Sequence, residues 1–277
     1  MDYDDLESIL IENNDLKAIN ERLQREISEH KRADEKIKKL NEDLSCRAAQ
    51  LEEANKELEA FSYTVSHDLR GPLTSINGFS QALLEFYGDK LDDAGKDMLQ
   101  RIYRGTKRMS QLIEDLLDLS LASHGEMTHE TIDLTMLAKK GATELQRTQP
   151  ERKVEFVIAD GVFAEGDLRL IAIVIKNLLV NAWKYSARQP VAHIEFGVLQ
   201  IENGKTAYFV RDNGIGFDIA DAEKIFEPFQ RLHDLTEFPG TGIGLATVKR
   251  GIQRHGGRVW AEGKVGKGAT FYFTLPS

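Results

Sequence analysis

A seven-residue ladder of apolar side chains runs through the first quarter of this 277-residue chain. Nine positions spaced by seven, from Ile9 to Val65, carry eight apolar side chains, and His30 is the exception. Residues 1–70 contain no proline and no glycine, so nothing in the sequence interrupts a helix there. Because an apolar residue at every seventh position forms the seam of a coiled coil, we expect a parallel two-stranded coiled coil over residues 1–60. The alternative is a single amphipathic helix packed on the chain's own globular part.

The ladder ends two residues before a histidine, in the segment SHDLRGPL at residues 66–73. The apolar positions of this helix leave His67 on the opposite side, where its imidazole would face solvent. Asp68 follows directly and can accept a proton from the ring in a favourable rotamer. Pro72 lacks the N–H that would bond the carbonyl of Asp68, so we expect the helix to kink one turn after the histidine. An exposed histidine is usually an ordinary surface residue, so its role depends on the rest of the chain.

Four short motifs follow in order in the second half of the chain. They are NLLVNAWKYS at residues 177–186, RDNGIGF at 211–217, IFEPFQRLH at 225–233 and GTGIGLATVKR at 240–250. Helical spacing places Asn177, Asn181 and Lys184 on one face, where an amide oxygen suits Mg²⁺ and an ammonium suits a phosphate. Asp212 ends a strand before a glycine turn and could accept a hydrogen bond from an adenine amino group. The alternate glycines of the last motif leave free N–H groups at a helix N-terminus, which favours phosphate. Turns and a helix cap explain each motif alone, but the four in this order predict a nucleotide site.

In these segments the chain resembles the sensor histidine kinases of two-component signalling, over residues 50–277. SHDLRGPL resembles the H box of that family, NLLVNAWKYS its N box, RDNGIGF and GTGIGL its glycine boxes, and FEPF its phenylalanine box. The resemblance implies that His67 is the phosphoacceptor and that Asp68 takes its proton. It also implies that Asn181 binds Mg²⁺ and that Asp212 recognises the adenine of ATP. The other positions that it implies around ATP are Asn177, Lys184, Tyr185, Gly214, Gly216, Phe226, Arg231, Gly240, Thr241, Gly242, Gly244 and Leu245, with Phe226 and Phe229 packing a lid between the glycine boxes.

The expected fold is α+β with three domains. A coiled-coil signalling helix covers residues 1–60, a dimerisation and phosphotransfer hairpin covers 61–124, and an α/β sandwich that binds ATP covers 125–277. Two copies of the hairpin would form a four-helix bundle. Within the sandwich we expect helices at 168–185 and 244–255, alternating with strands.

The resemblance implies a homodimer, a receiver domain of a response regulator as partner, and an upstream sensor domain outside this chain. We expect the receiver to dock near Asn77 and Ser80.

The net charge of −9 argues against nucleic-acid binding. The longest apolar run, residues 168–180, is interrupted by charged side chains and is too short to span a membrane. A single cysteine, Cys46, cannot form an intramolecular disulfide and fits a reducing, cytoplasmic location.

One position departs from part of the family. Members with phosphatase activity resemble one another in carrying Thr or Asn four residues after the histidine, and this chain has Gly71 there. Glycine has no side chain to orient a hydrolytic water, so we expect weak phosphatase activity. Two other functions stay open: a clamp-type ATPase of the related fold, which would lack an H box on a coiled-coil dimer, and a non-enzymatic dimeric signalling scaffold with a decayed kinase.

Overall fold

The computed structural model describes residues 3–123, 127–201, 204–230, 232, 238 and 240–276. The chain forms two compact units, Met1–Leu58 and Glu59–Ser277. Within the described residues, no helix combines the length and the apolar character needed to cross a membrane.

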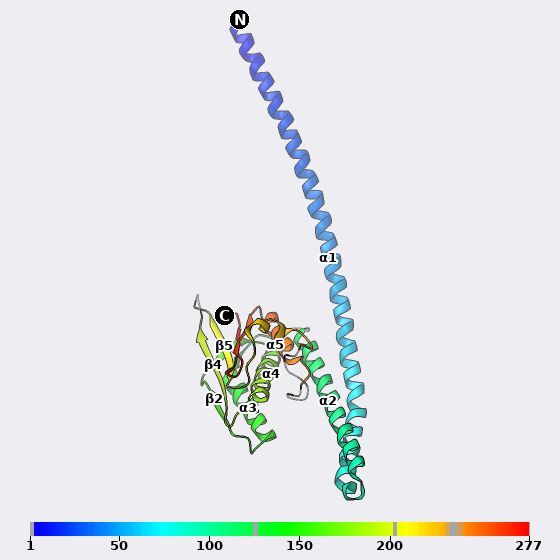
Figure 1. The fold of residues 1–277 in the computed structure, drawn as a ribbon. Coiled ribbons are helices and arrows are strands. Elements are labelled where there is room, and N and C mark those ends of the chain that lie inside the picture. The colour runs from blue at the N-terminus through cyan, green and yellow to red at the C-terminus, as the bar shows by residue number, and fades with distance from the viewer. Residues whose placement is uncertain are drawn as a thin grey trace. The chain divides into compact units, whose positions relative to one another are not determined.

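Helix α1 (Tyr3–Tyr87) contains the predicted helical segment from Tyr3 onward (Figure 1), and residues 1 and 2 lie outside the described residues. It continues through Pro72 without ending. Two side chains after the proline donate to carbonyls before it: Thr74 Oγ1 to Arg70 at 2.8 Å and Ser75 Oγ to Gly71 at 3.2 Å. These are side-chain bonds to the carbonyl four residues earlier, and neither replaces the bond that the carbonyl of Asp68 loses at Pro72.

The apolar ladder is exposed in this single chain. Among its described apolar rungs, Leu23, Ile37, Leu44 and Leu51 are between 50% and 72% exposed, and Val65 is partly buried. Exposed leucine and isoleucine at seven-residue spacing leave a seam open to a second helix. The coiled coil therefore stays a prediction.

A short 3₁₀ turn, η1 (Gly88–Lys90), connects α1 to helix α2 (Asp93–Ser123). The two helices form a hairpin in which Thr106 Oγ1 of α2 donates to Asn77 Oδ1 of α1 at 3.1 Å. Ser80 is only 4% exposed, so the expectation that it offers a docking surface is wrong. The spacing of residues along one helix does not show which small polar side chains become buried when the chain folds.

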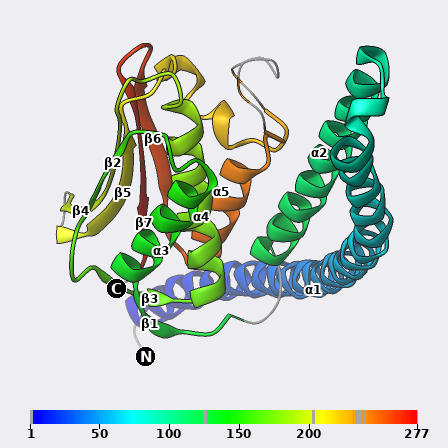
Figure 2. The same ribbon diagram turned by 90° about the horizontal axis from the view of Figure 1, so that it is seen from below.

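The remainder is an α/β sandwich with a five-stranded sheet. Its elements in order are β1 (Glu130–Asp133), α3 (Leu134–Thr148), β2 (Val154–Ile158), β3 (Phe163–Gly166), α4 (Leu168–Tyr185), β4 (Ala192–Gln200), β5 (Thr206–Asp212), η3 (Ile219–Asp221), η4 (Lys224–Phe226), α5 (Gly244–Arg254), β6 (Val259–Lys264) and β7 (Gly268–Thr274). The sheet order is β2-β4-β5-β7-β6, in which only β2 and β4 are parallel. Strands β1 and β3 form a separate antiparallel pair. Helices α3, α4 and α5 lie on one face of the large sheet (Figure 2), as expected for a sandwich.

Helix α4 is the central element of the core. Its apolar face, including Ile175 and Leu178, is at most 7% exposed and packs with sheet residues such as Phe196 and Phe273. Its N-cap is Asp167, whose carboxylate accepts from the N–H groups of Arg169 and Leu170. Burial alone would raise the pKa of Asp167, but hydrogen bonds from Arg169, Thr128 and Leu170 hold that pKa well below its usual range. The cap fixes where α4 begins, and so fixes which of its side chains reach the site.

Candidate functional site

The polar face of α4 lies along a cavity. Leu178, Leu179 and Ala182 are buried in the core, so they mark the inner face of the helix. The polar residues of α4 lie on the opposite face. The structure places Asn177, Asn181, Lys184 and Tyr185 in the lining of this polar cavity. Two amides, an ammonium and a phenol therefore converge from one helix.

The second glycine loop closes the cavity at the start of α5. A Cβ on Gly244 would lie 2.6 Å from Asn177 Oδ1, and a Cβ on Gly240 would lie 2.8 Å from Lys184 Nζ. Only a residue without a side chain lets these two α4 groups approach the loop backbone so closely. Gly240, Thr241, Gly242, Gly244 and Leu245 all line the cavity. The first N–H groups of α5 are at this end, where a helix N-terminus favours an anion.

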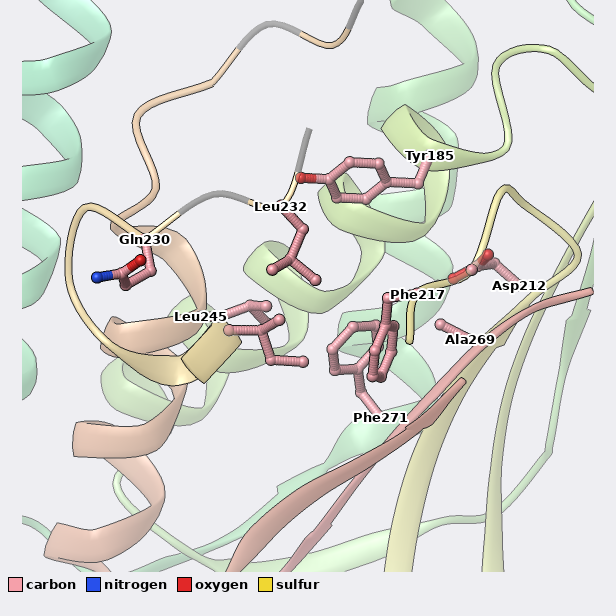
Figure 3. Close-up of a pocket in the computed structure, with 10 residues that line it drawn as sticks. Tyr185, Asp212, Phe217, Gln230, Leu232, Leu245, Ala269 and Phe271 are labelled. Carbon is pink, nitrogen blue, oxygen red and sulfur yellow. The ribbon is translucent and has the colours of Figure 1, made fainter. Parts of the chain in front are cut away.

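A second cavity, lined mostly by apolar groups, adjoins the first (Figure 3). Its lining consists of Tyr185, Asp212, Gly216, Phe217, Ile225, Gln230, Leu232, Leu245, Ala269 and Phe271. Among these described residues, Asp212 supplies the one carboxylate. An apolar slot with a single strong acceptor suits a planar base that carries an amino group.

Asp212 is held in place by the glycine turn that follows it. The carboxylate is 5% exposed, and its Oδ1 accepts from Gly214 N at 2.8 Å. Burial raises the pKa of Asp212 to about 6, while backbone hydrogen bonds from Gly214 and Ala269 act in the opposite direction. Near neutral pH the group is therefore a desolvated carboxylate, which is a strong hydrogen-bond acceptor.

The first glycine turn joins β5 to the C-terminus of α4. Ile215 N donates to Tyr185 O at 3.2 Å. Gly216 has a left-handed φ of 65°, and a Cβ there would lie 2.0 Å from Lys264 O. Any side chain at position 216 would push β6 away, so the turn needs glycine.

The two cavities share Tyr185, Ile225, Gln230 and Leu245 in their linings. Together they fit an elongated ligand with a planar apolar end and a polyanionic end, such as ATP. No group of three or more His, Cys, Asp or Glu side chains that could hold a metal occurs within the described residues. Asn181 in the polar cavity carries an amide oxygen, which is a kind of ligand that Mg²⁺ accepts, so this residue would suit a magnesium ion that accompanies the phosphates.

Some predicted residues lie elsewhere. Phe226 is 5% exposed and packs edge-on against Phe271 at 6.4 Å between centroids, so it supports the core rather than lining either described cavity. The expectation that Phe229 packs the lid is wrong, because its ring is 65% exposed at a backbone φ of 63°. Asp68 is exposed on α1. The side chain of His67 and all of Arg231 lie outside the described residues.

Several residues that line or support the site were not predicted from the sequence. Lys176 lines the polar cavity one position before Asn177, and Gln230 lines both cavities. Phe238 packs on Tyr185 with ring centroids 5.3 Å apart. Helical spacing could have suggested Lys176, whereas the contact of Phe238 depends on a loop that no local pattern places.

We expect the affinity for adenosine to fall as the pH drops below about 6, because protonation of Asp212 removes the negative acceptor. The ionised form of Asp212 is the one that binds adenosine. The loss of affinity is therefore absent well above the pKa and grows as the pH falls below it. At one unit below the pKa only about one-tenth of the protein is ionised, and the apparent Kd should rise about tenfold. Calorimetric titration with adenosine, which lacks phosphates that titrate nearby, measures this profile. A constant Kd between pH 5 and pH 8 would contradict it.

Comparisons with known proteins agree with this geometry. The family of histidine kinase-, DNA gyrase B- and HSP90-like ATPases matches residues 166–277. The His Kinase A (phospho-acceptor) domain matches residues 57–125. These two matches cover the segment with His67 and the segment with both cavities.

Individual relatives are similar over most of the chain. Cyanobacterial phytochrome B of Nostoc sp. is 36% identical over 236 residues, which are 84% of this chain and 31% of that protein. Sensor histidine kinase WalK of Bacillus subtilis is 34% identical over 233 residues, which are 81% of this chain and 38% of that protein. The chain thus spans about a third of the length of these relatives. A crystal structure of full-length ShkA in complex with AMPPNP has the same fold, with a TM-score of 0.58 at 22% identity over 78% of this chain and 45% of that chain.

Proposed function

This chain is built from the phosphoacceptor domain and the ATPase domain of a histidine kinase, and from that premise we propose that it transfers the γ-phosphoryl group of ATP to His67. The observation that carries the proposal is the apolar slot with Asp212, continuous with a polar cavity lined by Asn181 and Lys184. The AMPPNP complex of the similarly folded ShkA supports ATP as the nucleotide.

In the proposed mechanism the residues of the two cavities bind and orient ATP. Asp212 accepts from the adenine amino group, and Lys184 with the N–H groups of residues 240–244 binds the phosphates. Mg²⁺ bound at Asn181 would neutralise charge on the triphosphate. His67 attacks the γ-phosphorus in line, Asp68 accepts the imidazole proton, and ADP leaves.

We further propose that the working unit is a homodimer. Exposed apolar side chains of the hairpin, including Ile76, Phe79, Met98 and Ile102, are between 44% and 73% exposed in the single chain. A face of this kind suits a four-helix bundle formed with a second hairpin.

The proposed domains are a coiled coil over 1–60, the hairpin over 61–124 and the ATP-binding domain over 125–277. A phosphohistidine is a good phosphoryl donor, so the proposed acceptor is an aspartate of a response-regulator receiver domain.

Incubation with γ-labelled ATP and Mg²⁺ tests the proposed function. A histidine kinase gives protein-bound label that acid removes and alkali leaves in place, because a phosphoramidate is labile to acid. A clamp-type ATPase would release labelled phosphate without labelling the protein. A scaffold with a decayed kinase would do neither.

Substitution of Gly71 by threonine should raise the rate at which the protein dephosphorylates its receiver partner, by about tenfold if the hydroxyl positions the attacking water. A Cβ at position 71 meets nothing within 4 Å, so the backbone there has room for the first atom of a side chain. Gly78→Thr is the matched control, since Gly78 is on the same helix and its Cβ also meets nothing within 4 Å. The assay follows loss of label from the phosphorylated receiver. Rapid dephosphorylation by the unaltered chain would contradict the role assigned to Gly71.

A further inference from the structure

Helix α2 lies against α5 and reaches the polar cavity. Among the described residues, four polar contacts join it to the ATP-binding domain. They are Thr241 Oγ1 donating to Asp115 Oδ2, the ion pair of Lys176 Nζ with Asp118 Oδ2 at 3.7 Å, Arg250 Nη1 donating to Ser123 Oγ at 2.9 Å, and Arg254 Nη1 donating to Leu121 O at 3.1 Å. The first two involve residues that line the polar cavity.

The charges of the cavity are divided between its two sides. Helix α2 contributes the carboxyl groups of Glu114, Asp115 and Asp118. The ATP-binding domain contributes Lys176, Lys184 and the glycine loop. Burial raises the pKa of Asp118, Lys176 lowers it, and the neighbouring Asp115 and Glu114 raise it further. Acidic side chains of α2 thus occupy the side of the cavity that faces the groups suited to phosphates.

The polyphosphate of ATP would meet α2 in two ways. Its negative charges would lie close to three carboxyl groups, and like charges repel at this range. It would also lie beside Thr241 and Lys176, which line the cavity and are both bonded to α2. Simultaneous occupation of the cavity by α2 and by the phosphates is therefore unfavourable.

We propose that helix α2 and the polyphosphate of ATP compete for the same side of the cavity, so that nucleotide binding releases the ATP-binding domain from α2. This inference rests on the proposed function, because it requires that nucleotide phosphates occupy this cavity. In the released state the domain is free to move along the hairpin that carries His67. In the docked state α2 acts as an internal inhibitor.

The double variant Asp115→Asn with Asp118→Asn tests the competition. We expect it to bind AMPPNP about tenfold more tightly than the unaltered chain, since two contacts of this kind together are worth about 1.4 kcal/mol. The gain should be smaller for ADP and absent for adenosine, which carries no phosphate. Calorimetric titration of the full chain measures all three. Asp97→Asn is the matched control, because Asp97 is on α2 but pairs with Arg101 outside the cavity.

A second variant separates competition from simple charge repulsion. Arg250 contacts Ser123 of α2 and lies outside the lining of the polar cavity. Arg250→Gln removes a cation, so electrostatics alone would weaken AMPPNP binding. Competition predicts the opposite, about threefold tighter binding, because one α2 contact of roughly 0.7 kcal/mol is lost.

The outcomes are distinct. Weaker or unchanged AMPPNP binding in either variant would overturn the competition while leaving the proposed function intact. Equal gains for adenosine and AMPPNP would also overturn it, because the phosphates would not be responsible. If neither nucleotide binds the unaltered chain or any variant, the proposed function fails and this inference fails with it.

Discussion

Substitution of Asn181 by alanine should lower the rate of autophosphorylation by about a thousandfold, because stabilisation by a metal ion is worth several kcal/mol and each 1.4 kcal/mol is tenfold in rate. Asn181 is one of the amides that α4 presents to the polar cavity, and the proposed site gives Mg²⁺ no ligand from the protein other than this one. The rate is measured from the accumulation of label from γ-labelled ATP at saturating Mg²⁺.

Gln253→Ala is the control for this variant. Gln253 is an exposed amide on α5 and lines neither described cavity, so its loss should leave the rate unchanged. Adenosine binding should also survive in Asn181→Ala, because the slot that contains Asp212 is intact. Autophosphorylation of Asn181→Ala within a few fold of the unaltered rate would contradict the metal role of Asn181.

Substitution of Asp212 by asparagine should weaken ATP binding by about a hundredfold, since a hydrogen bond to a charged group contributes about 1.5–3 kcal/mol. The carboxylate accepts from the backbone N–H groups of Gly214 and Ala269 while it faces the slot. An amide has only one acceptor oxygen. In either orientation of the asparagine amide, its NH₂ group faces another donor. That donor is a backbone N–H in one orientation and the adenine amino group in the other.

The Asp212→Asn variant should stay folded, because the substitution removes a charge whose burial is unfavourable, as the pKa of about 6 indicates. Thermal unfolding checks this, and calorimetric titration with ATP measures the binding. Asp218→Asn is the matched control, since Asp218 is an exposed acid that caps η3 through Ala220 N at 3.0 Å. Equal ATP affinity for Asp212→Asn and the unaltered chain would remove Asp212 from the nucleotide site.

The sequence predicted those parts of the site that depend on local spacing. The side chains of α4 at 177, 181 and 184 line one cavity because a helix repeats every 3.6 residues and the apolar face between them is buried. Asp212 lies beside its glycine turn because the two are adjacent in the chain. Helices over 168–185 and 244–255 were predicted within one residue of α4 and α5.

What the sequence did not predict depends on packing between distant segments. Helix α3 was not predicted, and its Gly141 is explained only by Leu179 of α4, whose Cδ1 lies 2.8 Å from where a Cβ would be. Ser80 was assigned to a surface because spacing within one helix does not show that this side chain is covered, yet it is 4% exposed. The contacts of Asp115 and Asp118 with the ATP-binding domain join residues far apart in the chain, and no spacing rule connects them.

His67 is the proposed phosphoacceptor, and mapping the modified residue is the direct test of that role. After incubation with ATP and Mg²⁺ the protein is digested at alkaline pH, which preserves phosphohistidine, and the peptides are sequenced by tandem mass spectrometry. We expect the phosphate on His67 in the unaltered chain and no phosphopeptide in His67→Ala. Phosphate on a different residue, or the same modification in His67→Ala, would contradict the account.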